Sequence, residues 1–238
     1  MSTPVSTMTP IDTKSEYLKI ISIIAHNVKG PVKYMQYITD YTLENWKTLN
    51  PQDLRECALA INESARRINE QLVDIMNWAR VQDGSFNPAH REFAISKSIK
   101  RELKLLKPML RMKSIALSKQ FEKDLNISSD ENIFHLAFHN VITNAIKFSR
   151  RKGVINVSTS LEKDRVAIAI QDSGVGMDAE ELALLEDDHA FSNPGTVEEQ
   201  GTGFGLRIAK ELISLLDGEI QIESEKDVGT KVTILLPA

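Results

Sequence analysis

Two asparagines and a lysine recur at helical spacing within residues 135–148. Asn140 and Asn144 are four residues apart and therefore share one helical face, with Lys147 beside Asn144. Amide oxygens suit Mg²⁺, and an ammonium group neutralises phosphate oxygens. The stripe is suited to hold a hydrated Mg²⁺ and phosphate groups; the alternative is a polar face that contacts only water.

A second group combines a carboxylate with glycines directly after a predicted strand. Asp172, Gly174 and Gly176 form the pattern D-x-G-x-G. The carboxylate can accept a hydrogen bond from an exocyclic amine, and the glycines allow the backbone to approach a flat ring. This pattern alone is moderately specific for a base-binding loop.

A third group is glycine-rich and lies where a helix is expected to begin. Gly201, Thr202, Gly203 and Gly205 belong to the pattern G-T-G-x-G. Backbone N–H groups at a helix N-terminus, with the helix dipole behind them, form a phosphate cradle. No strand with βαβ spacing leads into this stretch, so it is not the Rossmann fingerprint, and the Walker A pattern is absent.

A histidine near the N-terminus has an unusual helical setting. His26 is followed by Asn27 and Lys29 and, one turn later, by Gly30 and Pro31. An exposed imidazole can act as a nucleophile at neutral pH, although such a histidine is more often simply solvated. Gly and Pro cost a helix interior about 1 and about 3 kcal/mol relative to Ala. We expect the helix to kink or loosen beside His26.

The order of these motifs resembles the catalytic and ATP-binding domain of two-component sensor histidine kinases, a Bergerat-type (GHKL) ATPase fold. Residues 26–32, His-Asn-Val-Lys-Gly-Pro-Val, resemble the phosphoacceptor box of the same family. The resemblance covers residues from about 15 to 238. It implies a kinase that autophosphorylates a histidine from ATP and passes the phosphoryl group to an aspartate of a response regulator.

The resemblance also assigns roles to individual residues. His26 would be phosphorylated, Asn27 would orient its imidazole, and Asn144 would bind Mg²⁺. Asp172 would bind the adenine amine. The nucleotide-binding residues would be Asn140, Lys147, Asp172, Gly174, Gly176, Gly201, Thr202, Gly203, Gly205 and Thr230.

Two positions depart from the family pattern. Many members carry Asp or Glu directly after the histidine, whereas Asn27 cannot act as a base at neutral pH. Members that also dephosphorylate their partner often carry Thr or Asn four residues after the histidine, where this chain has Gly30. We therefore expect slower phosphotransfer and weak or absent phosphatase activity.

An acidic segment precedes the glycine-rich stretch. Residues 177–201 contain eight acidic side chains and no Lys or Arg. By the same resemblance this segment would be the ATP lid. Because its charge would repel a triphosphate except through Mg²⁺, we expect a mobile lid; the alternative is a solvated helix and loop. The acidic residues are Asp178, Glu180, Glu181, Glu186, Asp187, Asp188, Glu198 and Glu199.

Two heptad seams must position His26. They consist of Tyr17, Ile21, Ile24, Val28, Pro31, Met35, Ile38 and Thr42, and of Leu54, Ala58, Ile61, Ala65, Ile68, Leu72, Ile75 and Ala79. Asn50 suits a helix N-cap, Pro51 the first helical position, and Asp53 the first turn. The pattern predicts a helical hairpin. Two hairpins paired as a homodimeric four-helix bundle would cover both seams, whereas an intramolecular bundle would need heptad helices that the chain lacks.

Beyond the turn-rich residues 82–88, strands and helices alternate in mixed order. This order predicts an α/β sandwich, one sheet with helices on one face. The expected domains are a flexible tail (1–14), a dimerisation and histidine-phosphotransfer domain (15–85) and a catalytic ATP-binding domain (86–238). Expected strands are 115–122, 153–161, 165–171, 219–223 and 230–236, and expected helices are 99–110, shortened by Pro108, a helix capped by Ser129 that ends near 148, and 202–216.

Composition narrows the function classes. The 238 residues include 29 Lys and Arg against 33 Asp and Glu, a net charge of −4, which argues against a nucleic-acid partner. A single cysteine excludes an internal disulfide. No apolar run reaches the roughly 18 residues of a membrane span, and no signal peptide is evident. We expect a cytoplasmic chain without membrane contact, or the cytoplasmic part of a longer membrane-bound sensor.

Two other functions remain compatible with these residues. A histidine phosphotransferase with a decayed ATPase domain would need no nucleotide, and an ATP-regulated dimeric scaffold would carry out no transfer. The intact asparagine and glycine motifs argue against the first, whereas Asn27 leaves the second open.

Overall fold

The structure is a computed structural model that describes residues 10–82, 88–123, 125–186 and 205–238. Within these ranges, side chains are described for all residues except 10–27, 70, 74, 78, 82 and 186. The chain divides into two compact units, residues 1–76 and 77–238. The predicted domain boundary between 85 and 86 lies outside the described residues.

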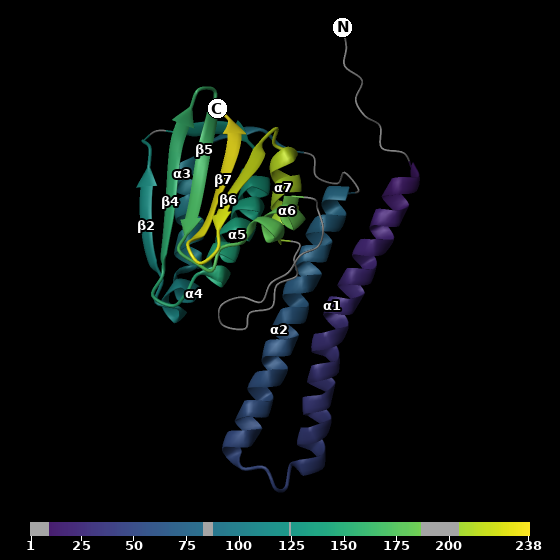
Figure 1. The fold of residues 1–238 in the computed structure, drawn as a ribbon. Helices are drawn as coiled ribbons and strands as arrows, with labels where there is room; N and C mark the ends of the chain where they lie inside the picture. The colour runs from purple at the N-terminus through teal and green to yellow at the C-terminus, as the bar shows by residue number, and fades with distance from the viewer. Residues whose placement is uncertain (1–9, 83–87, 124, 187–204) are drawn as a thin grey trace. The chain divides into compact units, whose positions relative to one another are not determined.

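The first unit contains a helical hairpin. Helices α1 (Pro10–Asn45) and α2 (Pro51–Gln82) lie side by side and run in opposite directions (Figure 1). The Asn50 side chain accepts hydrogen bonds from the backbone N–H groups of Gln52 (2.8 Å) and Asp53 (2.9 Å), which confirms the predicted N-cap. α1 begins at Pro10, so residues 10–14 are helical rather than part of the predicted tail. Proline suits a first helical position because its missing N–H has no intrahelical partner there.

The α1 seam is as predicted, whereas the α2 seam is shifted. The described seam residues of α1, from Val28 to Thr42, are all half-buried. In α2, Ile61, Ile68 and Ile75 are half-buried, but the other predicted seam positions, Leu54, Ala58, Ala65, Leu72 and Ala79, are exposed. The positions that complete the buried stripe are Cys57, Ser64 and Gln71. α2 therefore carries two stripes, and only one of them faces α1.

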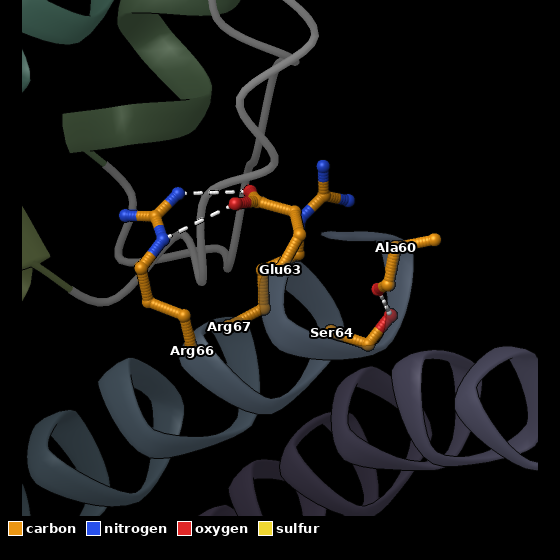
Figure 2. A network of polar contacts seen from close by, with 5 residues as sticks. All are labelled: Ala60, Glu63, Ser64, Arg66 and Arg67. Atoms are coloured by element: carbon orange, nitrogen blue, oxygen red, sulfur yellow. Dashed lines mark hydrogen bonds and ion pairs between the residues drawn. The ribbon is translucent and has the colours of Figure 1, made fainter. Parts of the chain in front are cut away.

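Polar contacts within α2 satisfy groups on both of its sides (Figure 2). Ser64 is 4% exposed, and its hydroxyl donates to the Ala60 carbonyl at 2.9 Å. On the outer side, the Glu63 carboxylate accepts hydrogen bonds from Arg66 (2.8 Å) and Arg67 (3.2 Å). The Arg66 hydrogen bond, supported by Arg67, holds the pKa of Glu63 below its usual value. Such pairs one turn apart contribute only about 0.2–0.5 kcal/mol each.

The second unit is built on a five-stranded sheet with one parallel pair. The strand order is β2-β4-β5-β7-β6, in which β2 and β4 are parallel and the other neighbours are antiparallel. A separate antiparallel pair, β1 with β3, was not predicted from the sequence because both strands are only four residues long. The bounds are β1 Arg91–Ala94, β2 Ala116–Phe121, β3 Asn126–Ser129, β4 Val154–Glu162, β5 Arg165–Asp172, β6 Glu219–Glu225 and β7 Gly229–Pro237.

Helices cover one face of this sheet, as the sequence predicted. Figure 1 shows α3, α5 and α7 behind the strands, on a single side. The bounds are α3 Ile95–Leu105, α4 Lys107–Met112, α5 Glu131–Phe148, α6 Ala179–Glu186 and α7 Gly205–Ser214. The break at Leu106 places Pro108 in the first turn of α4, where proline is tolerated.

The core lies between the sheet and the helices. Side chains at alternate strand positions, such as Ile155, Ile168 and Ile234, are fully buried, and so are helix residues such as Phe138 and Leu212. The N-cap of α5 is Asp130 rather than Ser129. Its carboxylate accepts from the N–H groups of Asn132 (2.9 Å) and Ile133 (3.1 Å), because Ser129 is still paired in β3.

Candidate active site

The predicted asparagine stripe meets the start of α7. A Cβ added at Gly205 would lie 3.5 Å from Asn140 Oδ1 and 3.6 Å from Asn144 Nδ2. The N-terminus of α7 therefore faces both amides. Asn140 Nδ2 is buried and has no hydrogen-bond partner among the described residues. An unpartnered buried donor beside a helix N-terminus fits an anionic ligand, because both supply positive charge.

Helix α5 presents these amides because its two faces differ. Its apolar residues, including Ile133, Ala137 and Val141, are buried. Asn140, Asn144 and Lys147 are half-buried on another face. Lys147 Nζ lies 4.5 Å from the centre of the Phe148 ring. The structure thus keeps the three residues on one stripe at the end of the helix.

Asp172 and Thr230 meet at one end of the sheet. Val166, Ile168 and Ile170 point into the core, and Asp172 is the next residue in this inward row of β5. Asp172 is 7% exposed, and its carboxylate accepts a hydrogen bond from the Gly174 N–H at 2.8 Å. Burial raises the pKa of Asp172 from 3.8 to about 6, although N–H groups of Gly174 and Thr230 oppose that rise.

The loop after Asp172 packs backbone against backbone. A Cβ at Gly174 would lie 2.4 Å from the Phe148 carbonyl oxygen. Gly176 has a φ of +61°, and a Cβ there would lie 1.9 Å from the Glu225 carbonyl oxygen. Both glycines are therefore required by the protein's own packing. Their additional role beside an adenine ring stays a prediction.

The turn between the two predicted strands β6 and β7 closes over this loop, a contact that was not recognised from the sequence. The Asp227 N–H donates to the Val175 carbonyl at 2.6 Å, and the Met177 N–H donates to the Ser224 hydroxyl at 2.9 Å. The same hydroxyl lies 2.8 Å from Thr230 Oγ1. Ser224 and Thr230 are register partners that end the inward rows of β6 and β7. The sequence did contain a signal for this contact, because the alternating apolar residues of each strand end in a polar residue, Ser224 or Thr230.

The described beginning of the predicted lid is a capped helix. Asp178 accepts from the Glu181 N–H at 3.0 Å, while Glu181 accepts from the Asp178 N–H at 3.0 Å, a reciprocal capping box at the start of α6. Lys226 pairs with Asp178 at 2.9 Å. The hydrogen bond from Glu181 and the pair with Lys226 lower the pKa of Asp178.

Several predicted site residues lie outside the described part of the chain. Gly201, Thr202 and Gly203 belong to residues 187–204. His26 and Asn27 lie within α1, but their side chains are not described. The structure therefore brings together Asn140, Asn144, Lys147, Asp172, Gly174, Gly176, Gly205 and Thr230 within one domain.

Known proteins are similar to this chain in sequence and in fold. Residues 129–238 match the family described as histidine kinase-, DNA gyrase B-, and HSP90-like ATPase. The heme sensor protein HssS of Staphylococcus saprophyticus is 30% identical over 221 residues, which are 89% of this chain and 44% of that protein. The chain spans less than half the length of the curated relatives it matches.

Solved structures extend the likeness to both units. The histidine kinase AdeS of Acinetobacter baumannii has a TM-score of 0.72 at 16% identity, covering 89% of this chain and 97% of that one. Histidine kinase ThkA, solved in complex with the response regulator protein TrrA, has a TM-score of 0.72 at 17% identity, covering 98% of this chain and 68% of that one. At such identities the likeness shows the fold.

The C-terminal domain is thus an ATPase domain of the histidine kinase, gyrase B and HSP90 type. With its N-terminal helical hairpin, the chain resembles the catalytic core of two-component sensor histidine kinases in sequence and in fold. Among the described helices, none is long and apolar enough to cross a membrane.

Proposed function

We propose that this chain binds Mg²⁺ and ATP in residues 86–238 and transfers the γ-phosphoryl group to His26. The phosphoryl group then passes to an aspartate of a response regulator. The observation that carries the proposal is the convergence of Asn140 and Asn144 on the N-terminus of α7, in a domain of the histidine kinase ATPase family.

The adenine and the phosphate groups of the nucleotide would bind at opposite ends of the site. Asp172 would accept a hydrogen bond from the adenine amine, beside Gly174, Gly176 and Thr230. Asn140 and Lys147 would contact phosphate oxygens, and Gly201, Thr202, Gly203 and Gly205 would supply backbone N–H groups. Asn140 Nδ2 supports this assignment because it is a buried donor with no acceptor among the described residues.

The amide side chains also fit a divalent cation. Asn144 would hold Mg²⁺ through its carbonyl oxygen, a ligand that Mg²⁺ accepts. When bound, the cation would neutralise charge that develops on the phosphate oxygens. The protein's contribution would be to orient the triphosphate and to place its own positive groups around it.

The phosphate acceptor would be His26, on a helix weakened just beyond it. Pro31 lies inside α1 and cannot donate a hydrogen bond to the carbonyl of residue 27. Gly30 adds no side chain, and a Cβ there would meet nothing within 4 Å. These features support an open helical surface after the histidine, with Asn27 orienting the ring.

The partners are part of the proposal. The exposed α2 stripe supports a homodimer through residues 15–85, because a second hairpin would cover Ala58, Ala65 and Leu72. A receiver domain of a response regulator would dock on the hairpin around His26; the TrrA complex is that of a related kinase. Cytoplasmic location, either alone or within a longer membrane-bound sensor, follows as the expected setting.

Incubation of the full chain with γ-labelled ATP and Mg²⁺ tests the kinase. Label on the protein should be acid-labile and base-stable, and both His26→Ala and Asn144→Ala should abolish it. A labelled His26→Ala variant would place the acceptor elsewhere.

Two results would favour other functions. Nucleotide binding without label would support an ATP-regulated scaffold, for which Asn27 in place of an acid is the relevant feature. Acceptance of a phosphoryl group by His26 from a phosphorylated receiver, without nucleotide binding, would support a histidine phosphotransferase.

A further inference from the structure

A buried lysine caps the C-terminal end of α5. Lys113 follows α4 and is 5% exposed. Its Nζ donates to the carbonyl oxygens of Ile146 at 2.9 Å and Lys147 at 2.6 Å, and it lies 3.4 Å from the Ser149 carbonyl oxygen. The last carbonyls of a helix have no N–H group of the same helix to accept a hydrogen bond from. A positive charge beside them is also favoured by the helix dipole.

The backbone around Lys113 holds this ammonium group in place. The Lys113 carbonyl accepts from the Lys152 N–H at 2.9 Å, and the Gly153 carbonyl accepts from the Ala116 N–H at 2.9 Å. The turn before β2 and the turn before β4 are thereby joined. Lys113 therefore reaches α5 from a part of the fold whose position does not depend on α5 alone.

The other terminal carbonyls of α5 have different partners. Ala145 O accepts from the Ser149 N–H (3.0 Å) and hydroxyl (2.7 Å), and Phe148 O accepts from the Val175 N–H (3.2 Å). The carbonyls of Ile146 and Lys147, which lie between these two, accept hydrogen bonds from Lys113. Removing the ammonium would loosen the turn that carries Lys147 and adjoins Asn144.

The loop beside Asp172 has anchors that do not involve Lys113. The Val175 carbonyl accepts from Asp227 N–H, and the Asp172 carboxylate accepts from Gly174 N–H. Loss of the Lys113 ammonium should therefore disturb the phosphate end of the site more than the adenine end.

We propose that Lys113 is a positioning residue for the Mg²⁺ and phosphate end of the nucleotide site, acting through the last turn of α5. This inference rests on the proposed function. Removal of a group that orients a metal ligand typically weakens metal binding about 10–100-fold. Since Lys113 acts one turn away from Asn144, we expect the lower end of that range.

The test compares nucleotide binding with and without Mg²⁺ in the full chain. Lys113→Met keeps the length of the side chain and removes its donors. Calorimetric titration with a non-hydrolysable ATP analogue should show about tenfold weaker binding in Mg²⁺, and a distinctly smaller loss in EDTA, where only the phosphate contact of Lys147 is affected. Lys113→Arg should recover most of the Mg²⁺-dependent affinity because the guanidinium still donates to carbonyls.

Two control variants separate positioning from charge and stability. Lys104→Met removes an exposed lysine from the nearby α3 and should leave both affinities unchanged. Leu103→Ala opens a cavity in the core and lowers the melting temperature without touching the α5 carbonyls. It should reduce the folded fraction and leave the ratio of the two affinities unchanged.

The proposal is overturned if Lys113→Met weakens binding equally in both buffers, or not at all. If Lys113→Met does not fold, Lys113→Leu, which also lacks donors, takes its place, and a wild-type ratio of the two affinities would overturn the proposal in the same way. Failure of the unmodified chain to bind nucleotide in either buffer would contradict the proposed function instead.

Discussion

The Val175 N–H donates to the Phe148 carbonyl at 3.2 Å, so the loop after Asp172 is hydrogen-bonded to the last residue of α5. This bond joins two of the motifs read from the sequence. It is possible only because Gly174, between Asp172 and Val175, has no Cβ to push Phe148 away. The proposed adenine and phosphate ends of the site are thus coupled through main-chain atoms.

Gly174→Ala should separate this loop from α5. The added Cβ would lie 2.4 Å from the Phe148 carbonyl oxygen and 2.6 Å from Asp172 Oδ1. Forcing such an overlap apart typically costs about 1–3 kcal/mol. We expect a lower melting temperature of the ATPase domain and weaker nucleotide binding, measured by calorimetry.

Gly30→Ala is the matched control and should have the opposite effect on stability. It adds the same methyl group inside α1, where nothing lies within 4 Å. Alanine stabilises a helix interior by about 0.5–1 kcal/mol relative to glycine. Destabilisation by Gly30→Ala, or a neutral Gly174→Ala, would contradict the described packing.

Nucleotide affinity should fall as the solution is acidified through the pKa of Asp172. The carboxylate is protonated below about pH 6 and is then a weaker acceptor for the adenine amine. Asp172→Asn should weaken binding about 10–100-fold at pH 7.5, the value of a hydrogen bond to a charged group. Wild type should approach the variant below pH 6, in titrations between pH 5 and 8.

The same substitution should raise folding stability. Since the folded state keeps the Asp172 proton up to about pH 6 and the unfolded state loses it near 3.8, wild-type stability falls as the pH rises between these values. The difference between the two pKa values corresponds to a loss of at most about 3 kcal/mol of folding free energy at pH 7. Denaturant titrations of Asp172→Asn should lack this decrease; an unchanged pH profile would show that Asp172 is not the group responsible.

Leu72→Glu should dissociate the proposed dimer. Leu72 is 47% exposed and lies on the α2 stripe that does not face α1. Each buried leucine contributes about 1.5–3 kcal/mol, and twofold symmetry doubles the loss. Sedimentation should show a dissociation constant raised at least about 100-fold.

Leu59→Glu controls for the new charge. Leu59 is 54% exposed on the same helix but outside that stripe, so the variant should sediment like wild type. Equal dissociation by both variants, or by neither, would contradict a dimer built on the Leu72 stripe.

Gly30→Thr should introduce phosphatase activity. A hydroxyl one turn after His26 can orient water toward a phosphorylated aspartate, whereas glycine offers no polar group. Because nothing lies within 4 Å of the added Cβ, the hydroxyl can be accommodated. We expect a phosphorylated receiver to decay no faster with wild type than alone, and at least about tenfold faster with the variant. Robust dephosphorylation by wild type would refute the role of Gly30.

Local patterns were sufficient to predict most elements. The heptad repeat of α1, the Asn50 cap and the alternation in β4 and β5 depend on neighbours in the chain, and the structure confirms them. Short strands such as β1 and β3 carry too few residues for a period to appear. The Ser129 cap was wrong by one residue, because pairing in β3 extends to Ser129.

The sequence by itself determined which chemical groups this chain has and in which order. They are a histidine in the first helix, a helix with two asparagines on one face, an aspartate at the end of a strand, and glycine-rich turns. Only the tertiary structure decided which of them meet. The polar ends of β5, β6 and β7 gather because antiparallel register aligns Ser224 with Thr230 and brings the latter's N–H to Asp172. Likewise, Lys113 caps α5 from a distant turn, a contact that no local periodicity encodes, since side-chain packing across the core sets it.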